Sequence, residues 1–259
     1  MRLDGARVLV TGAGSGIGRA LAIALAARGA RLVLNGRREA ALAATQALLP
    51  IPANAVIVAA DITTAAGRDA LFQACTTPGG LDLLVNNAGV VISGRFADLT
   101  DADMSRLFAT NVIAPMALTR QLLPLLQLSS QARIVNIGSV FGDIGHPLFA
   151  GYCASKFALR GLSDALRREL AAVGIGVTYA APRATRTAAA DGFADLMQPF
   201  DMAMDMPETI AAQIVAAVAQ DRDRIYARGA ERLFVLMQRL LPQLVDRALI
   251  GKYRRFAAR

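Results

Sequence analysis

Short apolar runs alternate along the chain with longer segments in which alanine and leucine recur among charged residues. Strands are predicted for residues 7–10, 31–34, 55–59, 81–85, 133–137, 176–180 and 224–227. Helices are predicted near residues 17–28, 38–49, 65–75, 101–127, 151–173 and 208–219. Strands that are apolar throughout and separated by helices are typical of a parallel sheet covered on both faces. The pattern therefore predicts a doubly wound α/β fold with about seven strands.

Two segments depart from this alternation. Residues 188–207 carry four methionines and two phenylalanines, and they are long for a connection between a strand and a helix. Residues 230–259 form a further helical pattern that is interrupted at Pro242. We expect one domain over residues 1–229, with an insertion at about 188–207, and a C-terminal helical extension over 230–259.

Composition narrows the classes of protein. With 54% hydrophobic and 19% charged residues, the 259-residue chain has enough apolar material for one large globular domain. The net charge of +8 suits a polyanionic partner, but aromatic residues are only 5% and the arginines are scattered, so we expect no nucleic-acid partner. Two cysteines without metal-ligand spacing predict no metal site and a reduced environment. With no long apolar segment, the expectation is a cytoplasmic protein.

The first predicted strand runs into the glycine-rich stretch TGAGSGIG, residues 11–18. Glycines let the backbone turn tightly and approach a pyrophosphate, which amides at a helix N-terminus can bind. The strict G-x-G-x-x-G spacing fails, whereas T-G-x-x-x-G-x-G fits Thr11, Gly12, Gly16 and Gly18. A tight connection without a ligand is the alternative, but a strand, this loop and then a helix favour nucleotide binding.

The end of the second predicted strand, LNGRRE, bears on the choice of nucleotide. An acidic residue there would bond the adenosine 2′-hydroxyl, whereas an arginine would accommodate a 2′-phosphate. Gly36 leaves the acidic position empty, and Arg37 and Arg38 follow it. This favours NADP over NAD, with Arg37 preferred because a guanidinium can bind phosphate through two hydrogen bonds. The alternative is that both arginines are solvated charges at the start of the next helix.

Several further motifs follow in order: DI at 61–62, NNAG at 86–89, Asn111, Ser139 and YCASK at 152–156. With the glycine loop, they make residues 5–228 resemble the short-chain dehydrogenase/reductase family, whose members have a single Rossmann-like domain and commonly form dimers or tetramers. The resemblance implies a catalytic set of Asn111, Ser139, Tyr152 and Lys156. Together with the two arginines, it implies cofactor contacts from Gly12, Ser15, Gly16, Ile17, Gly18, Arg37, Arg38, Asp61, Ile62, Asn87, Ala88, Gly89, Tyr152, Lys156, Pro182 and Thr187.

The proposed chemistry gives these residue types a reason. A free phenol has a pKa of about 10, and an ammonium one helical turn away would lower it, so Lys156 is expected to activate Tyr152. Ser139 can hydrogen-bond the oxygen of the substrate. By resemblance, Lys156 also binds the nicotinamide ribose and Asn111 holds a water behind the lysine. The cofactor itself supplies the hydride.

Other interpretations of the same residues exist. Each catalytic candidate taken alone is compatible with a structural role, and a non-catalytic NADP-binding regulator of the same fold is the competing class. His146 lies in GHP and no G-x-S-x-G motif is present, so a loop or pocket-wall role is favoured over a hydrolase. Cys153 is predicted to point to another face of the helix and to pack.

The chain departs from the family pattern after the sixth predicted strand, where it reads APRATRT. Pro182 and Thr187 fit the pattern, but Arg183 replaces its glycine. Either the turn needs no positive φ, or Arg183 points into the substrate pocket and favours an anionic group.

The last two segments bear on the substrate. The methionine-rich insertion corresponds to the family's substrate lid and suits an apolar ligand. The extension carries apolar residues at helical spacing beside Arg232, Arg239, Arg247, Lys252, Arg254 and Arg255. It could lie on an anionic membrane, cover the substrate entrance or pack in an oligomer; packing is favoured and peripheral membrane contact stays open. The sequence thus predicts an NADP-preferring oxidoreductase of a carbonyl/alcohol pair, of unassigned substrate and direction.

Overall fold

A computed structural model describes residues 1–187, 190–226, 229 and 231–258. Within these residues, seven parallel strands form one sheet in the order β3-β2-β1-β4-β5-β6-β7. The strands are β1 (Arg7–Val10), β2 (Arg31–Gly36), β3 (Ala55–Ala59), β4 (Leu83–Asn86), β5 (Arg133–Ile137), β6 (Gly176–Ala181) and β7 (Arg224–Tyr226). The predicted doubly wound fold is confirmed, and each strand lies within about two residues of its predicted position.

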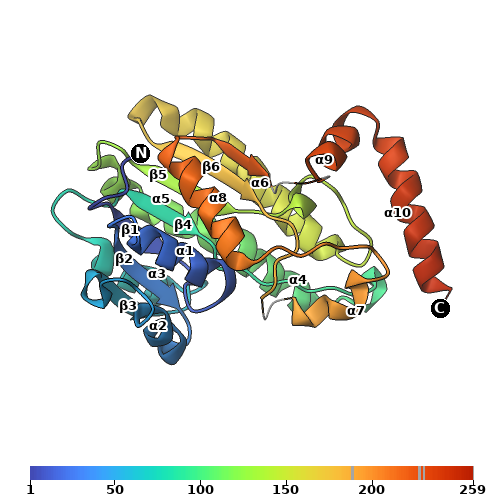
Figure 1. The fold of residues 1–259 in the computed structure, drawn as a ribbon, viewed down its shortest axis with the longest axis horizontal. Helices are drawn as coiled ribbons and strands as arrows, with labels where there is room; N and C mark the ends of the chain where they lie inside the picture. Colours follow the sequence, from blue (N-terminus) through green and yellow to red (C-terminus); the bar gives the residue numbers. More distant parts are fainter. Residues whose placement is uncertain (188–189, 227–228, 230, 259) are drawn as a thin grey trace.

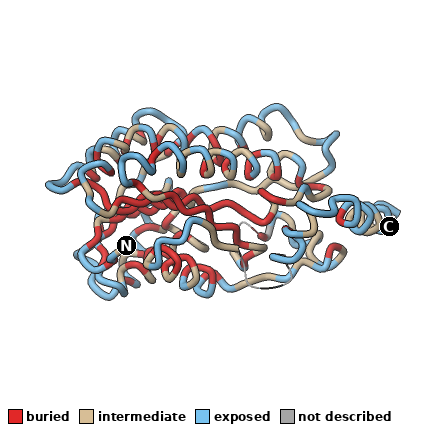
Figure 2. Tube along the Cα trace, turned by 90° about the horizontal axis from the view of Figure 1, so that it is seen from above, coloured by how far each residue is buried: buried red, intermediate tan, exposed pale blue. Residues whose placement is uncertain are grey.

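Helices cover both faces of the sheet (Figures 1 and 2). One face packs against α1 (Gly16–Ala26), α2 (Glu39–Gln46) and α8 (Pro207–Ala219), and the other against α3 (Ala65–Cys75), α5 (Ala114–Gln127) and α6 (Ala150–Leu170). Within β1, Val8 and Val10 join the first layer of the core and Leu9 joins the second. Burial of alternate residues on opposite faces explains why the strands are continuously apolar.

The predicted helix over residues 101–127 is divided by a π turn. Thr100 and Asp103 form a capping box at the start of α4 (Asp101–Phe108), and the π turn Ala109–Ile113 then leads into α5. Pro115 has no N–H to donate to the carbonyl of Asn111, so the α-helical ladder is interrupted there. The prediction of one continuous helix was wrong at this turn, which contains Asn111.

Short 3₁₀ turns complete the body of the fold at Pro52–Asn54, Phe96–Asp98, Val140–Gly142 and Ala171–Val173. The described part of the 188–207 insertion contains a 3₁₀ turn at Asp191–Phe193 and the short helix α7 (Ala194–Met197), whereas residues 188 and 189 lie outside the described residues.

The extension forms α9 (Glu231–Leu240) and α10 (Pro242–Ala257), and α10 stands away from the sheet at the right of Figure 1. Pro242 begins α10, where its missing N–H costs no helical hydrogen bond. The interruption predicted at Pro242 is confirmed. In the described parts of the chain, no helix is both long enough and apolar enough to cross a bilayer.

Candidate active site

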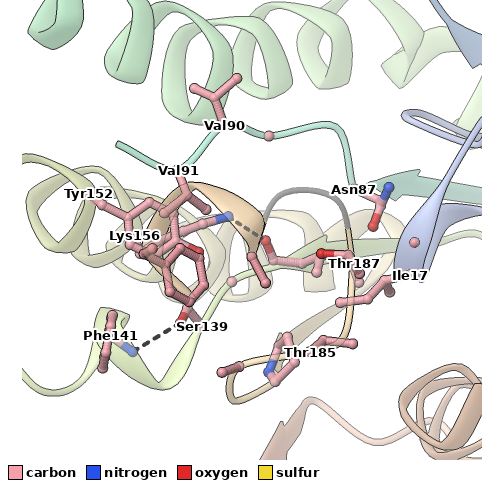
Figure 3. A pocket seen from close by; sticks show the side chains of 18 of the residues that line it. Ile17, Asn87, Val90, Val91, Ser139, Phe141, Tyr152, Lys156, Thr185 and Thr187 are labelled. Atoms are coloured by element: carbon pink, nitrogen blue, oxygen red, sulfur yellow. Dashed lines mark hydrogen bonds between the residues drawn. The ribbon is translucent and has the colours of Figure 1, made fainter. Parts of the chain in front are cut away.

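A cavity of about 830 Å³ lies at the carboxyl ends of the strands. It runs from the glycine loop and the end of β2, past the ends of β4 and β5, to the insertion and the extension. The strand order reverses between β1 and β4, and ligands of open parallel sheets bind at such a switch point. Figure 3 shows Tyr152, Lys156 and Ser139 in this pocket, with Asn87 and Ile17 at its other end.

The glycine loop forms the first wall. Gly12 and Gly16 have φ values of +66° and +52°, which strongly favour glycine. A Cβ at Gly18 would collide with the carbonyl oxygen of Gly12 and with Nδ2 of Asn87. The side chain of Ser15, at the N-cap of α1, makes no capping hydrogen bond within the described residues. The amides at the start of α1 are therefore suited to an anionic ligand.

Hydrogen bonds from Thr11 and Asn87 fix this loop. Thr11 Oγ1 accepts from the backbone N–H groups of Asn87 and Ala88 at 2.9 and 3.0 Å, and it donates to the carbonyl of Val85 at 3.1 Å. Asn87 Nδ2 in turn donates to the carbonyl of Thr11 at 2.8 Å. The NNAG motif after β4 thus holds the glycine loop as well as lining the cavity.

The end of β2 forms the wall nearest the predicted 2′-phosphate site. Gly36, Arg37 and Arg38 line the cavity, and both arginines are exposed. Asp61, after β3, accepts hydrogen bonds from the N–H and hydroxyl of Thr63 at 2.9 and 2.7 Å. These bonds lower the pKa of Asp61, with a smaller contribution from the charge of Arg37. The amides and the two arginines together fit a phosphorylated dinucleotide.

The predicted cofactor residues come together with one exception. Gly18 is buried beneath the loop, and the following residues line the cavity: Gly12, Ser15, Gly16, Ile17, Arg37, Arg38, Asp61, Ile62, Asn87, Ala88, Gly89, Tyr152, Lys156, Pro182 and Thr187. The methyl group of Thr187 closes over Gly16, because a Cβ there would lie 2.8 Å from it. Six separate stretches of sequence therefore contribute to one surface.

Tyr152 and Lys156 lie one turn apart on α6, and Ser139 lies after β5. Removal of the Tyr152 hydroxyl from bulk water raises its pKa to about 12, although a hydrogen bond with the Ser139 side chain opposes this shift. Burial lowers the pKa of Lys156 to about 8, and its Nζ donates to the carbonyl of Ile137 at 2.9 Å.

The sequence predicts that Lys156 lowers the pKa of Tyr152, whereas in the structure the pKa of Tyr152 is raised. The Lys156 ammonium lies 5.7 Å from the centroid of the Tyr152 ring, and burial of the phenol is the largest influence on the Tyr152 pKa. The phenol is protonated at neutral pH in this state, which suits a proton donor.

Asn111 does not line the cavity but lies behind it, in the π turn. Its Oδ1 accepts from the N–H of Val90 at 2.8 Å, and its Nδ2 donates to the carbonyl of Val90 at 2.9 Å and to Ser155 Oγ at 3.0 Å. The side chain thus joins the segment after β4 to α6, the helix of Tyr152 and Lys156. A π turn inside a helix often marks a functional position.

Residues 6–195 match the family model described as short chain dehydrogenase. The chain belongs to the short-chain dehydrogenase family. A ketoacyl reductase from Nostoc sp. is 31% identical to this short-chain dehydrogenase over 253 residues, which cover 95% of this chain and 88% of the relative.

Solved structures of other short-chain dehydrogenases have the same fold over nearly the whole chain. One from Burkholderia phymatum in complex with NAD is 28% identical, with a TM-score of 0.85 over 94% of this chain and 96% of that one. One from Sphingobium yanoikuyae in complex with NADPH is 29% identical, with a TM-score of 0.79 over 93% and 96%. This short-chain dehydrogenase is therefore an oxidoreductase of a family that uses nicotinamide cofactors, and its relatives are compatible with either nucleotide.

Sequence reasoning missed two buried residues of this short-chain dehydrogenase. The hydroxyl of Tyr179, in β6, donates to the carbonyl of Ser139 at 3.1 Å and accepts from its N–H at 3.4 Å, so it positions the Ser139 backbone. Asp143 accepts from Arg160 and Arg239 at 2.9 Å each and from the Tyr226 hydroxyl at 3.2 Å. No spacing in the sequence marks either contact, because each joins segments far apart in the chain.

Arg183 lines the cavity of this short-chain dehydrogenase, but its guanidinium binds Asp205 at 2.6 Å. The Asp205 carboxylate offsets the positive charge of Arg183, which argues against a role of Arg183 in binding an anionic substrate group. Arg183 is not among the residues with positive φ, so the turn needs no glycine, in line with the first of the two readings. The backbone around it is held by a bridge between Thr185 and Asp205.

Aromatic side chains form the substrate end of the cavity. The His146 ring stacks on Phe141 with centroids 4.9 Å apart and meets Phe200 edge-on at 4.8 Å, which confirms its predicted place in the pocket wall. Burial lowers the pKa of His146, so its ring is neutral at pH 7. Cys153 is buried in the same apolar cluster, as predicted, and burial raises its pKa to about 11. The short-chain dehydrogenase thus offers an apolar space next to Tyr152.

Proposed function

We propose that this short-chain dehydrogenase transfers a hydride between NADP(H) and an apolar carbonyl/alcohol substrate. The observation that carries the proposal is the convergence of Ser139, Tyr152 and Lys156 in the cavity whose other end is the glycine loop. The loop suits the pyrophosphate of a dinucleotide, and the aromatic wall suits a hydrophobic substrate.

The chain's own residues supply the proton and the orientation. Nicotinamide, when bound, supplies or accepts the hydride. Ser139 hydrogen-bonds the substrate oxygen, and Tyr152 gives its hydroxyl proton to that oxygen as negative charge develops during reduction. Lys156 contributes positive charge next to the phenol, and Asn111 holds its helix against the segment after β4. In alcohol oxidation, the same proton moves in the opposite direction.

The assay is a panel of carbonyls and alcohols with NADPH/NADP and with NADH/NAD. Tyr152→Phe is expected to lower turnover at least about 100-fold while NADPH binding, followed by calorimetry, is retained. Tyr253→Phe is the matched control, because Tyr253 is partly buried but does not line the cavity. Full activity of Tyr152→Phe would contradict the assignment, and saturable NADPH binding without turnover on any substrate would favour the non-catalytic regulator.

The preference for NADP is part of the proposal and has its own test. Arg37 lines the cavity and no carboxylate occupies the end of β2. Arg37→Ala is expected to raise the KM for NADPH by about tenfold or more and to leave the KM for NADH within about twofold, because a hydrogen bond to a charged group contributes roughly 1.5–3 kcal/mol. Arg31→Ala, an exposed arginine at the opposite end of the same strand, is the control. Equal effects on both cofactors would contradict the phosphate contact.

The apolar character of the substrate can be tested by chain length. Phe141, Phe149, Phe193 and Leu249 line the cavity. For a series of straight-chain ketones, kcat/KM is expected to rise by about fourfold per added methylene until the space is filled, because burying one CH₂ contributes about 0.8 kcal/mol. A flat series would argue against this wall as the substrate site.

We further propose the organisation that the sequence predicts: one domain over residues 1–229 with a lid at about 188–207, in a homo-oligomeric cytoplasmic protein. Exposed apolar side chains on α5 and α6 and on the turn before α5 support association, namely Ile113, Met116 and Phe157. Light scattering of the purified protein would give the oligomeric state, and a monomer at micromolar concentration would contradict it.

A further inference from the structure

The outer surface of the extension is apolar and uncovered. Leu233, Leu236 and Leu240 share one face of α9 by their spacing of three and four residues, and their exposed fractions are 59%, 50% and 67%. Leu241, at the N-cap of α10, and Leu244, in its first turn, follow in the sequence and are 56% and 46% exposed. We call these five residues the leucine edge. Isolated exposed leucines are ordinary, whereas five exposed leucines within twelve consecutive residues indicate an interaction surface.

The leucine edge does not result from α9 and α10 lacking contacts with the rest of the protein, because the other side of these helices faces the body of the fold. Phe234 and Leu249 line the cavity, and Val235 and Val245 are the two buried residues among the described side chains of α9 and α10. The ion pair between Arg239 and Asp143 holds α9 onto the body of the protein. The extension thus uses one side for the cavity and leaves the other to water.

Positive charge accompanies the leucine edge. Residues 231–259 contain seven basic and two acidic residues, so they carry more than half of the chain's net charge of +8. Four of the basic residues are exposed and have no ion pair with any described residue: Arg232, Arg247, Arg254 and Arg255. Arg232 directly precedes Leu233, the first residue of the leucine edge. Arg247 and Arg254 share a face of α10 by their spacing of seven.

We infer that the leucine edge docks onto the surface of an anionic lipid bilayer. The leucines would enter the boundary between headgroups and acyl chains, and the unpaired arginines would meet lipid phosphates. A second copy of the chain is a poorer occupant, because pairing two such edges would bring unpaired arginines together without carboxylates to offset them. The sequence favours packing of the extension, and the structure bears this out for the inner side only.

Docking does not depend on the proposed oxidoreductase activity. Leucine-edge residues do not line the described cavity, and neither do the four unpaired arginines. A failure of vesicle binding would therefore leave the catalytic proposal untouched, and an inactive enzyme could still bind vesicles.

The first test is co-sedimentation of the full chain with vesicles of phosphatidylcholine alone and of phosphatidylcholine with phosphatidylglycerol. Binding is expected on the anionic vesicles and is expected to weaken with salt. The double variant L236E/L240E should bind at least about tenfold more weakly, because each leucine loses its apolar burial. Leu48→Glu, at an equally exposed leucine after α2, should bind like the parent protein.

A charge variant separates the arginines from the leucines. R247Q/R254Q should weaken binding to anionic vesicles by about 25-fold, because one arginine near such a surface contributes about 1 kcal/mol, or about fivefold. R28Q/R31Q, at two exposed arginines outside the extension, should change it by less than about twofold.

A spectroscopic version avoids charged substitutions that could disturb folding. The chain has no tryptophan, so Leu236→Trp introduces a single probe. Its emission should shift to shorter wavelength when anionic vesicles are added, and that of Leu48→Trp should not.

The inference is overturned if the parent protein does not bind anionic vesicles, if the leucine and charge variants bind as tightly as it does, or if both probes respond alike. It is also overturned if L236E/L240E lowers the molar mass in light scattering and leaves vesicle binding unchanged, which would assign the edge to a second copy.

Discussion

Lys156 carries a buried charge that should make the protein less stable than it would be without it. Its side chain is 5% exposed, and burial lowers its pKa from 10.5 to about 8. That difference corresponds to a cost of about 3 kcal/mol for keeping the ammonium folded at neutral pH. Replacing Lys156 by Met removes the charge and keeps a long unbranched side chain.

The substitution also removes one favourable contact. Nζ donates to the carbonyl of Ile137 at 2.9 Å, and loss of this hydrogen bond opposes the gain by about 1 kcal/mol. The net expectation for Lys156→Met without cofactor is a gain of about 2 kcal/mol in the free energy of unfolding. For a chain of this size, this corresponds to a rise in Tm of about 4 °C or more. The same variant should lose turnover.

The gain should depend on pH in a defined direction. Below about pH 8, both the folded and the unfolded parent protein keep the lysine protonated, so the full cost is present. Between about pH 8 and pH 10.5, the folded state has lost this proton while the unfolded state still binds it, and the stability of the parent protein rises with pH. The methionine variant lacks this titration, so the difference between the two proteins should shrink across that window.

Urea unfolding at about pH 7 and about pH 10 measures both quantities, with Arg168→Met at an exposed position of α6 as a control for replacing a cation in that helix. A variant less stable than the parent at about pH 7 would refute the reasoning. An equal stability difference between variant and parent at both pH values would also refute it, because burial of the Lys156 ammonium would then not be what destabilises the parent protein.

Three further substitutions test the site from other directions. Gly18→Ala should abolish cofactor binding measured by calorimetry, because its Cβ would collide with the carbonyl of Gly12. Near-normal affinity would contradict this, because it would mean that the loop can shift to accept the methyl group. Tyr179→Phe should lower kcat by about tenfold with little change in the KM for NADPH, because the hydroxyl that holds Ser139 is lost; an unchanged kcat would remove Tyr179 from a positioning role. Asp143→Asn should lower the free energy of unfolding by about 3 kcal/mol in urea, because two arginines lose a buried carboxylate, and an unchanged midpoint would contradict this.

Much of the fold was accessible from the sequence because its signals are local. Each strand is a short aliphatic run, and the glycine loop must be glycine at Gly12 and Gly16 for reasons of backbone geometry. The motif order then brings distant residues to one edge of the sheet, since the carboxyl ends of parallel strands meet there. Placement of Ser139 beside Tyr152 follows from topology once the family is recognised.

What the sequence could not supply depends on contacts between distant segments. The π turn lies just before Pro115, which cannot donate to the carbonyl of Asn111, and the periodicity of the helical pattern does not reveal it. The pairing of Arg183 with Asp205 depends on how residues 22 positions apart are folded back. The pKa of Tyr152 is raised chiefly by desolvation, which is a property of the packed site and not of the sequence near the tyrosine.

The carboxylate of Asp143 sets a limit on exchanging parts between relatives. It lies next to the turn that follows Ser139 and joins that turn to Arg160 of the catalytic helix, to Tyr226 of β7 and to Arg239 of the extension. An extension transplanted from a relative without a cation at the position of Arg239 would leave this buried charge undercompensated beside the catalytic residues. The extension and the catalytic turn therefore form one unit of exchange, and a chimera should carry both or neither.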